Sequence, residues 1–261
     1  MRKVVEVIPM KGFSKKIAAG MLAAVMATGA TAFADTATPS TVQQQVAQKL
    51  QKKSQFADVS ASAENGVVTL QGTVKTYADK LAAEKTARKV DHVSQVRDEI
   101  AVSGPAVSDT ELQQQVAKKL RYVGFDTGTQ VFDNFQVGVR DGVVTVIGET
   151  YQPMDKQDAL EEVARIPGVK GVVDQVKVAP VSNFDDEIRL RLVRAIYGGG
   201  SLAYGLDPAA PIRIVVDDGH VGLYGFVTSQ VDKAVAGVRA AQTFGVFGVQ
   251  NHLQTPQDQA R

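Results

Sequence analysis

The fold of this chain is decided by a stretch that occurs three times: ENGVVTLQGTV at 64–74, RDGVVTVIGET at 140–150 and DDGHVGLYGFV at 217–227. The copies are 76 and then 77 residues apart, and their agreement continues without a gap for about thirty residues after the second glycine. Such a register indicates one module written three times. Each copy has two glycines six residues apart: Gly66 and Gly72, Gly142 and Gly148, Gly219 and Gly225.

The first glycine of each copy predicts a tight β-hairpin. Asn65-Gly66, Asp141-Gly142 and Asp218-Gly219 are dipeptides that favour a two-residue type I′ turn, because both central residues of that turn need a positive φ. Apolar residues alternate with other residues on both sides of each turn, which is typical of half-buried antiparallel strands.

Helices are expected on both sides of the hairpin. Apolar residues at i, i+4 and i+8 predict an amphipathic helix before it, and Thr76, Gln152-Pro153 and Ser229 mark the start of a second helix after it. A last strand is expected to carry three apolar residues in each copy: Val93, Val96 and Ile100, then Val169, Val172 and Val176, then Val246, Val249 and Leu253. The predicted fold class is therefore α+β, with three tandem αββαβ modules whose helices cover one sheet face.

The predicted modules occupy residues 40–103, 108–179 and 183–255, the third being divergent, and an N-terminal signal peptide occupies residues 1–34. Basic residues precede an apolar run over 17–30, and a small-residue A-x-A site follows it, so we expect export to the periplasm with cleavage after Ala34. The run is shorter than the ~20 residues of a spanning helix. An uncleaved anchor is the alternative.

Composition excludes several classes of protein. The 261 residues include 44% hydrophobic and 22% charged residues, so the chain can bury real cores. There is no cysteine, which excludes lipoprotein attachment, disulfides, thiolate metal sites and thiol catalysis. Loss of the signal peptide would leave 24 basic and 27 acidic residues, so no nucleic-acid partner is expected. Translation could start at Met1 or at Met10, since the segment MKGFSKK that begins at Met10 is by itself a complete basic n-region of a signal peptide.

The repeated pattern, helix, [N/D]-G-x-V-x-[L/V]-x-G, helix and G-V-x-x-V, resembles the BON domain, named for bacterial osmotically inducible and nodulation proteins. The resemblance covers nearly all of residues 40–255 and is strongest in the first two copies. In the third, Gly222 stands where the others have threonine, and Phe244 replaces Asp91 and Pro167. The resemblance implies an envelope-associated periplasmic protein, linked to osmotic or envelope stress, that contacts phospholipid or other proteins. It also implies a structural role for Gly72, Gly148 and Gly225.

No pattern in the sequence points to catalysis, a cofactor or a metal. The three histidines show no metal-ligand spacing, and the glycines at 198–200 lack the Lys and Ser/Thr of a phosphate loop. Paired carboxylates such as Asp185-Asp186 are explained by helix starts. An Asp-Lys pair recurs at 79–80, 155–156 and 232–233; a ligand site is one explanation, and the first turn of a helix is the simpler one.

Two surfaces are candidates for contact with lipid or a partner. In the first copy, Lys49, Lys52 and Lys53 belong to a basic set that gives residues 40–102 a net charge of +2, although a solvated helix face would look the same. In the third copy, Tyr197, Leu202 and Tyr204 surround a glycine-rich stretch, and either form an exposed tip or fold back onto the core.

The leading hypothesis is a non-enzymatic, peripherally bound protein whose partner is anionic phospholipid. The alternative is a protein-interaction or chaperone-like factor that binds an envelope protein. No transmembrane helix is expected in the mature chain. The sequence leaves open the lipid or protein bound, the inducing stress, the oligomeric state and whether a monovalent ion binds.

Overall fold

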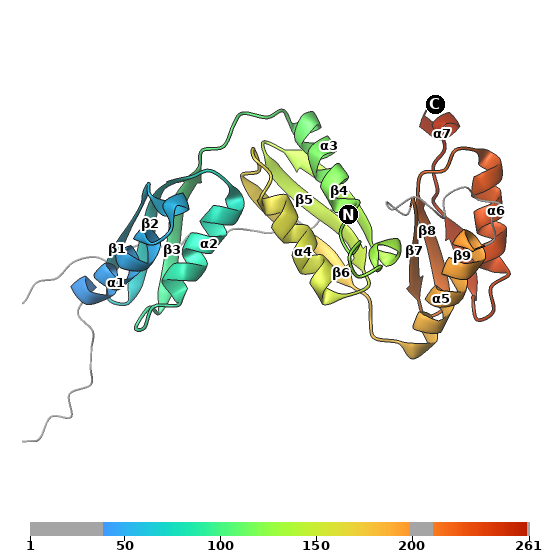
Figure 1. Ribbon diagram of the computed structural model, residues 1–261, viewed down its shortest axis with the longest axis horizontal. Helices are drawn as coiled ribbons and strands as arrows, with labels where there is room; N and C mark the ends of the chain where they lie inside the picture. The colour runs from blue at the N-terminus through green and yellow to red at the C-terminus, as the bar shows by residue number, and fades with distance from the viewer. Residues whose placement is uncertain (1–38, 199–210, 260–261) are drawn as a thin grey trace, which may run out of the picture. The chain divides into compact units, whose positions relative to one another are not determined.

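The computed structural model describes residues 39–198 and 211–259, so the expected signal peptide lies outside the described residues. Three modules of the same α+β construction follow one another along the chain, and each has its own sheet and its own two long helices (Figure 1). Module 1 contains α1 (Pro39–Gln51), η1 (Ser54–Phe56), β1 (Val59–Glu64), β2 (Val67–Val74), α2 (Tyr77–Arg88) and β3 (Gln95–Val102).

The other two modules repeat this order. Module 2 contains α3 (Asp109–Leu120), η2 (Gln130–Phe132), β4 (Asn134–Arg140), β5 (Val143–Thr150), α4 (Pro153–Ala164) and β6 (Gly171–Val178). Module 3 contains α5 (Asn183–Tyr197), β7 (Ile212–Asp217), β8 (His220–Gly225), α6 (Gln230–Ala241), β9 (Gly248–Asn251) and a short α7 (Pro256–Gln259). Every helix within the described residues is too short or too polar to cross a bilayer.

Each sheet combines a hairpin with a parallel crossover. The first two strands pair antiparallel, as β1 and β2 do with Val59 opposite Gly72. The chain then crosses through the second helix and returns with a third strand parallel to the second, as β3 does with Val96 opposite Val68. The strand orders are β1-β2-β3, β4-β5-β6 and β7-β8-β9, so the second strand of each hairpin is the central strand of its sheet.

The predicted type I′ turns are present in all three hairpins. In the first, Asn65 and Gly66 have φ values of 50° and 77°, and the equivalent pairs of modules 2 and 3 also have two positive values. The second glycine of each copy has a different constraint. A Cβ atom on Gly72 would overlap the Asp58 carbonyl oxygen, and Gly148 and Gly225 meet the same obstacle at Asn134 and Pro211.

Each module has a core under its two helices, and Val131 of η2 also contributes to the core of module 3. In module 1, Val46 and Leu50 of α1 and Ala83 of α2 are buried against Val68 and Leu70 of β2. The alanine recurs as Ala159 and Ala236, both fully buried, so the second helix lies close to its sheet. In module 1, the opposite sheet face carries exposed residues such as Ser60, Gln71 and Glu99.

The last strands begin later than the apolar pattern predicted. Val93, Val169 and Val246 lie in the turns before β3, β6 and β9. These turns contain a residue with positive φ in each copy, His92, Gly168 or Gly245, and a strand cannot continue through that conformation. In module 3, β9 also ends at Asn251, and Leu253 is buried beyond the strand.

Candidate functional site

The lysines predicted for lipid contact lie where two helices end. Lys49 is in the last turn of α1, and Lys89 follows the last residue of α2. The Lys49 Nζ donates to the Lys89 carbonyl oxygen at 3.0 Å, which holds the two helix ends side by side. Lys52 and Lys53 continue the chain directly after α1. We call these four residues, Lys49, Lys52, Lys53 and Lys89, the basic end of module 1.

The basic end is exposed and unneutralised. All four side chains are exposed, and none forms an ion pair with another of the described residues. Lys53 instead places its ammonium 5.5 Å from the centroid of the Phe56 ring. Arg88, which precedes Lys89 in the chain, is paired with Glu84 at 2.5 Å. The C-terminal ends of two helix dipoles favour cations here, which explains why four can gather.

The second predicted surface is only partly described. Tyr197 folds back onto the core of module 3, where its hydroxyl group donates to the Ile212 carbonyl oxygen at 2.5 Å and accepts from the Ile212 amide at 2.9 Å. Tyr197 therefore joins the end of α5 to the first residue of β7. Leu202 and Tyr204 lie outside the described residues, so their predicted contact stays a prediction.

The recurring lysine of the Asp-Lys pair ties the second helix to the last strand. Lys80 donates to the Ile100 carbonyl oxygen at 2.6 Å and lies 3.6 Å from an Asp98 carboxylate oxygen. Lys156 repeats this with Val176 at 2.6 Å and Asp174 at 2.8 Å. These contacts within the module favour a structural role for the lysine.

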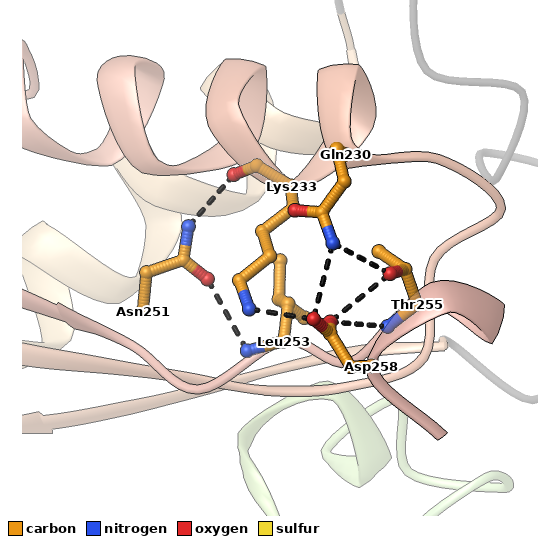
Figure 2. A network of polar contacts seen from close by, with 6 residues as sticks. All are labelled: Gln230, Lys233, Asn251, Leu253, Thr255 and Asp258. Atoms are coloured by element: carbon orange, nitrogen blue, oxygen red, sulfur yellow. Dashed lines mark hydrogen bonds and ion pairs between the residues drawn. The ribbon is translucent and has the colours of Figure 1, made fainter. Parts of the chain in front are cut away.

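Module 3 makes the equivalent contact with a carboxylate from the C-terminal segment (Figure 2). Asn251 stands where the other modules have aspartate, and its side chain donates to the Lys233 carbonyl oxygen at 2.7 Å. The Lys233 ammonium lies 3.5 Å from Asp258, which also accepts from Gln230 and from the Thr255 amide. Asp258 thus joins α7 to the start of α6.

The aspartate of the pair behaves differently in module 2. Asp79 accepts from the Thr76 hydroxyl at 2.7 Å, and Asp232 accepts from the Thr228 hydroxyl at 2.7 Å, so both belong to the cap of their helix. The cap of α4 is a glutamine that makes no side-chain capping bond. Asp155 is only 1% exposed and is directed away from the cap, toward the segment before β4.

Asp155 meets a second buried carboxyl group there. Asp133 is 2% exposed, and its Oδ1 accepts from the Tyr151 amide at 2.9 Å. The two carboxyl groups are within hydrogen-bonding reach of each other, and Thr129 also bonds Asp155. Burial raises the pKa of Asp133 to about 7 and also raises the pKa of Asp155.

The sequence did not single out Asp133. Residues 121–133 form a segment that is about six residues longer than its counterpart in module 1, residues 51–57, and Asp133 stands at the place of Ala57. A longer connecting segment of this kind can differ in role from its shorter counterpart. Only the folded chain brings its aspartate to the N-terminus of α4. This pair is the most perturbed set of titratable groups among the described residues.

The remaining acids and histidines have local explanations. Asp109 and Asp185 accept from the backbone amides of their hairpin turns, including those of Gly142 at 3.0 Å and Gly219 at 2.9 Å. His252 stacks on the Tyr224 ring at 4.9 Å. Within residues 39–198 and 211–259, no three or more His, Asp or Glu side chains are grouped so that they could hold a metal ion.

The sequence profile of the BON domain matches this chain three times, at residues 38–104, 108–180 and 191–257. The chain belongs to the BON domain family. Three BON domains account for all three modules, and the family implies in general a non-enzymatic role associated with phospholipid and the cell envelope. BON domain proteins are typically periplasmic.

Comparisons beyond the family give distant matches. Two solved structures of CdsD, a structural protein of the type III secretion system of Chlamydia trachomatis, one of them of its C-terminal domain, are similar over 80% and 83% of this chain and 94% of theirs, at 12% identity. Their TM-scores of 0.24 and 0.23 are too low to support an argument about function. No curated protein matches the sequence.

Proposed function

We propose that this BON protein is exported to the periplasm and binds anionic phospholipid surfaces peripherally through the basic end of module 1, without catalysing a reaction. Its work would fall in osmotic or envelope stress. The observation that carries the proposal is the group of four exposed lysines without a carboxylate partner among the described residues. Each lysine beside an anionic membrane surface contributes about 1 kcal/mol to binding.

Charge reversal at the basic end tests this proposal. The double change Lys52→Glu with Lys53→Glu removes two cations and leaves the hydrogen bond between Lys49 and Lys89 in place. It is expected to weaken binding to anionic vesicles roughly 30-fold, since two lost contacts amount to about 2 kcal/mol. Co-sedimentation of the full chain with anionic vesicles at low and high salt measures this, and added salt should weaken the binding of the wild type.

A matched control lies at the end of the first helix of module 2. Lys118→Glu with Lys119→Glu changes the net charge of the chain by the same amount, at a helix end where Lys119 already faces Glu162 at 3.4 Å. This variant is expected to bind nearly as well as the wild type. An equal loss of vesicle binding in both variants would show that binding depends only on the net charge of the chain. A wild type that binds no vesicle would reject the proposal.

A second candidate function, binding of an envelope protein, is favoured by an aromatic patch on module 3. Phe184, Phe244 and Phe247 are 45%, 82% and 71% exposed, and the rings of Phe184 and Phe247 stack at 5.8 Å. Exposed clusters of this kind commonly mark contact surfaces. If the wild type binds no vesicle, and if Phe244→Ser with Phe247→Ser abolishes its cross-linking to an envelope protein, the second candidate replaces the first.

A further inference from the structure

The buried carboxyl pair of module 2 is a built feature of that module. The equivalent aspartates of modules 1 and 3 cap their helices, whereas Asp155 gives up that position and lies in the interior. Its partner, Asp133, stands where module 1 has Ala57, at the end of a segment that is longer in module 2. Gly124 leaves room for the Asp133 side chain, because a Cβ atom at residue 124 would lie 2.9 Å from the Asp133 Oδ2. The φ of Gly124, 74°, also favours glycine at this position.

The hydrogen bonding of the pair is incomplete unless a proton is present. One oxygen of each carboxyl group, Oδ2 of Asp133 and Oδ2 of Asp155, is buried and has no hydrogen-bond partner in the part of the chain that the structure describes. A carboxylate only accepts hydrogen bonds, so two ionised groups in contact would leave both oxygens unsatisfied and would repel each other. A single proton removes both costs, since the protonated group donates to the ionised one.

We propose that Asp133 and Asp155 share one proton, and that release of this proton loosens residues 124–133 from the start of α4. Module 2 then carries a pH-responsive element that is independent of the lipid-binding proposal. The pair is placed for exchange with solvent, because Asp155 also lines an open depression of about 340 Å³ together with Asp126 and Asp158.

The charges around the pair act in both directions. Asp158 on α4 is negative and opposes ionisation of Asp155, so it favours the shared proton. Arg213 on β7 is positive and stabilises the ionised form of Asp133, and the Tyr151 amide does the same through its hydrogen bond. Burial of the Asp133 carboxyl group outweighs Arg213 and the Tyr151 amide, and it raises the pKa of Asp133 to about 7.

Two measurements on the full chain test the proposal. Carbon-detected NMR of the aspartate carboxyl groups is expected to show one member of the pair titrating at least about two pH units above the ordinary value of an aspartate. The protection of the Tyr151 amide against hydrogen exchange, corrected for the intrinsic rate, is expected to fall at least tenfold between about pH 5.5 and about pH 8.5.

The variants separate a shared proton from a general effect of pH. Asp133→Asn cannot ionise and can still donate to Asp155, so protection of the Tyr151 amide should become independent of pH, whereas Asp79→Asn should keep the wild-type response. If Asp133→Asn does not fold, Asp155→Asn takes its place. Titration of both carboxyl groups near their ordinary value would overturn the proposal. So would restoration of protection above neutral pH by Ca²⁺ alone, because a metal ion would then be the native occupant.

Discussion

Gly72, Gly148 and Gly225 show how one residue can be fixed by its neighbour's backbone. Each lies on the central strand opposite the first residues of its hairpin partner, where a carbonyl oxygen occupies the space of a Cβ atom. Their φ values of 124°, 144° and 115° are also reached with ease only by glycine. The identical spacing in three copies made these residues predictable from the sequence.

Gly148→Ala is expected to destabilise module 2 by about 3 kcal/mol, because the new methyl group must displace the backbone at Asn134 and the residue must hold a strained φ. Gly138→Ala is a control in the same sheet, since nothing lies within 4 Å of its Cβ position. Urea unfolding of both variants measures the difference. Equal midpoints would show that the crowding at Gly148 relaxes at no cost.

The pKa of Asp133 predicts a pH dependence of stability. A carboxyl group whose pKa rises from 3.8 to about 7 on folding holds more protons in the folded state than in the unfolded state. The free energy of unfolding should therefore fall as pH rises between these two values, by on the order of 4 kcal/mol at most. Urea unfolding at several pH values measures it. In Asp133→Asn this fall should be smaller, because only Asp155 keeps a pKa raised by burial, and an unchanged slope would contradict the assignment.

The contact between Asp133 and Asp155 could not be predicted from the sequence. The Asp of the Asp-Lys pair could be seen in all three copies, and a helix-start role explained it in two of them. In the middle copy, Asp155 meets Asp133, 22 positions earlier in the chain, where module 1 has Ala57. Repeat comparison does not point to Asp133, because the aspartate is not shared with module 1 and the segment before it differs in length between the two copies.

At the scale of elements, the three modules share a lysine near the start of the second helix that binds a carboxylate, and in modules 1 and 2 this lysine joins the second helix to the last strand. It stabilises the parallel crossover because it joins two elements whose backbones do not bond each other. Lys156 satisfies the Val176 carbonyl oxygen and Asp174 at once. Burial works against ionisation of Asp174, but the Lys156 and Val176 hydrogen bonds lower the pKa of Asp174 below its ordinary value.

Lys156→Met should destabilise module 2 by about 1 kcal/mol, since the stem still packs while the hydrogen bond and the partly exposed ion pair are lost. Lys118→Met is the control, because its side chain is exposed and has no ion pair among the described residues. Thermal unfolding of both proteins measures the effect. A larger loss in the control would show that Lys156 is not a structural tie.

Element order was predictable because the turn dipeptides, the helix starts and the alternating apolar residues agree in three copies. The N-caps Thr76, Gln152 and Ser229 are the residues that the sequence marked. The starts of the last strands were misplaced because apolar residues also fill the turn before each strand. Val169 is fully buried without being in a strand, so burial alone could not locate the boundary.

At the scale of the whole molecule, charge distinguishes modules that share a fold. Residues 40–102 carry nine basic and seven acidic residues, whereas residues 108–178 carry eight and eleven. The fold of the BON domain does not require either balance, because the cores are apolar in all three modules. The contrast is therefore a property of the surface, and it favours module 1 as the side that meets an anionic membrane.

Hydrogen exchange of the full chain with and without anionic vesicles locates the membrane contact. Binding through the basic end of module 1 predicts that the ends of α1 and α2, including Lys49, Lys53 and Lys89, gain protection, and that high salt abolishes this gain. Binding of the chain to these vesicles with no change at those helix ends, and with new protection confined to modules 2 and 3, would contradict it.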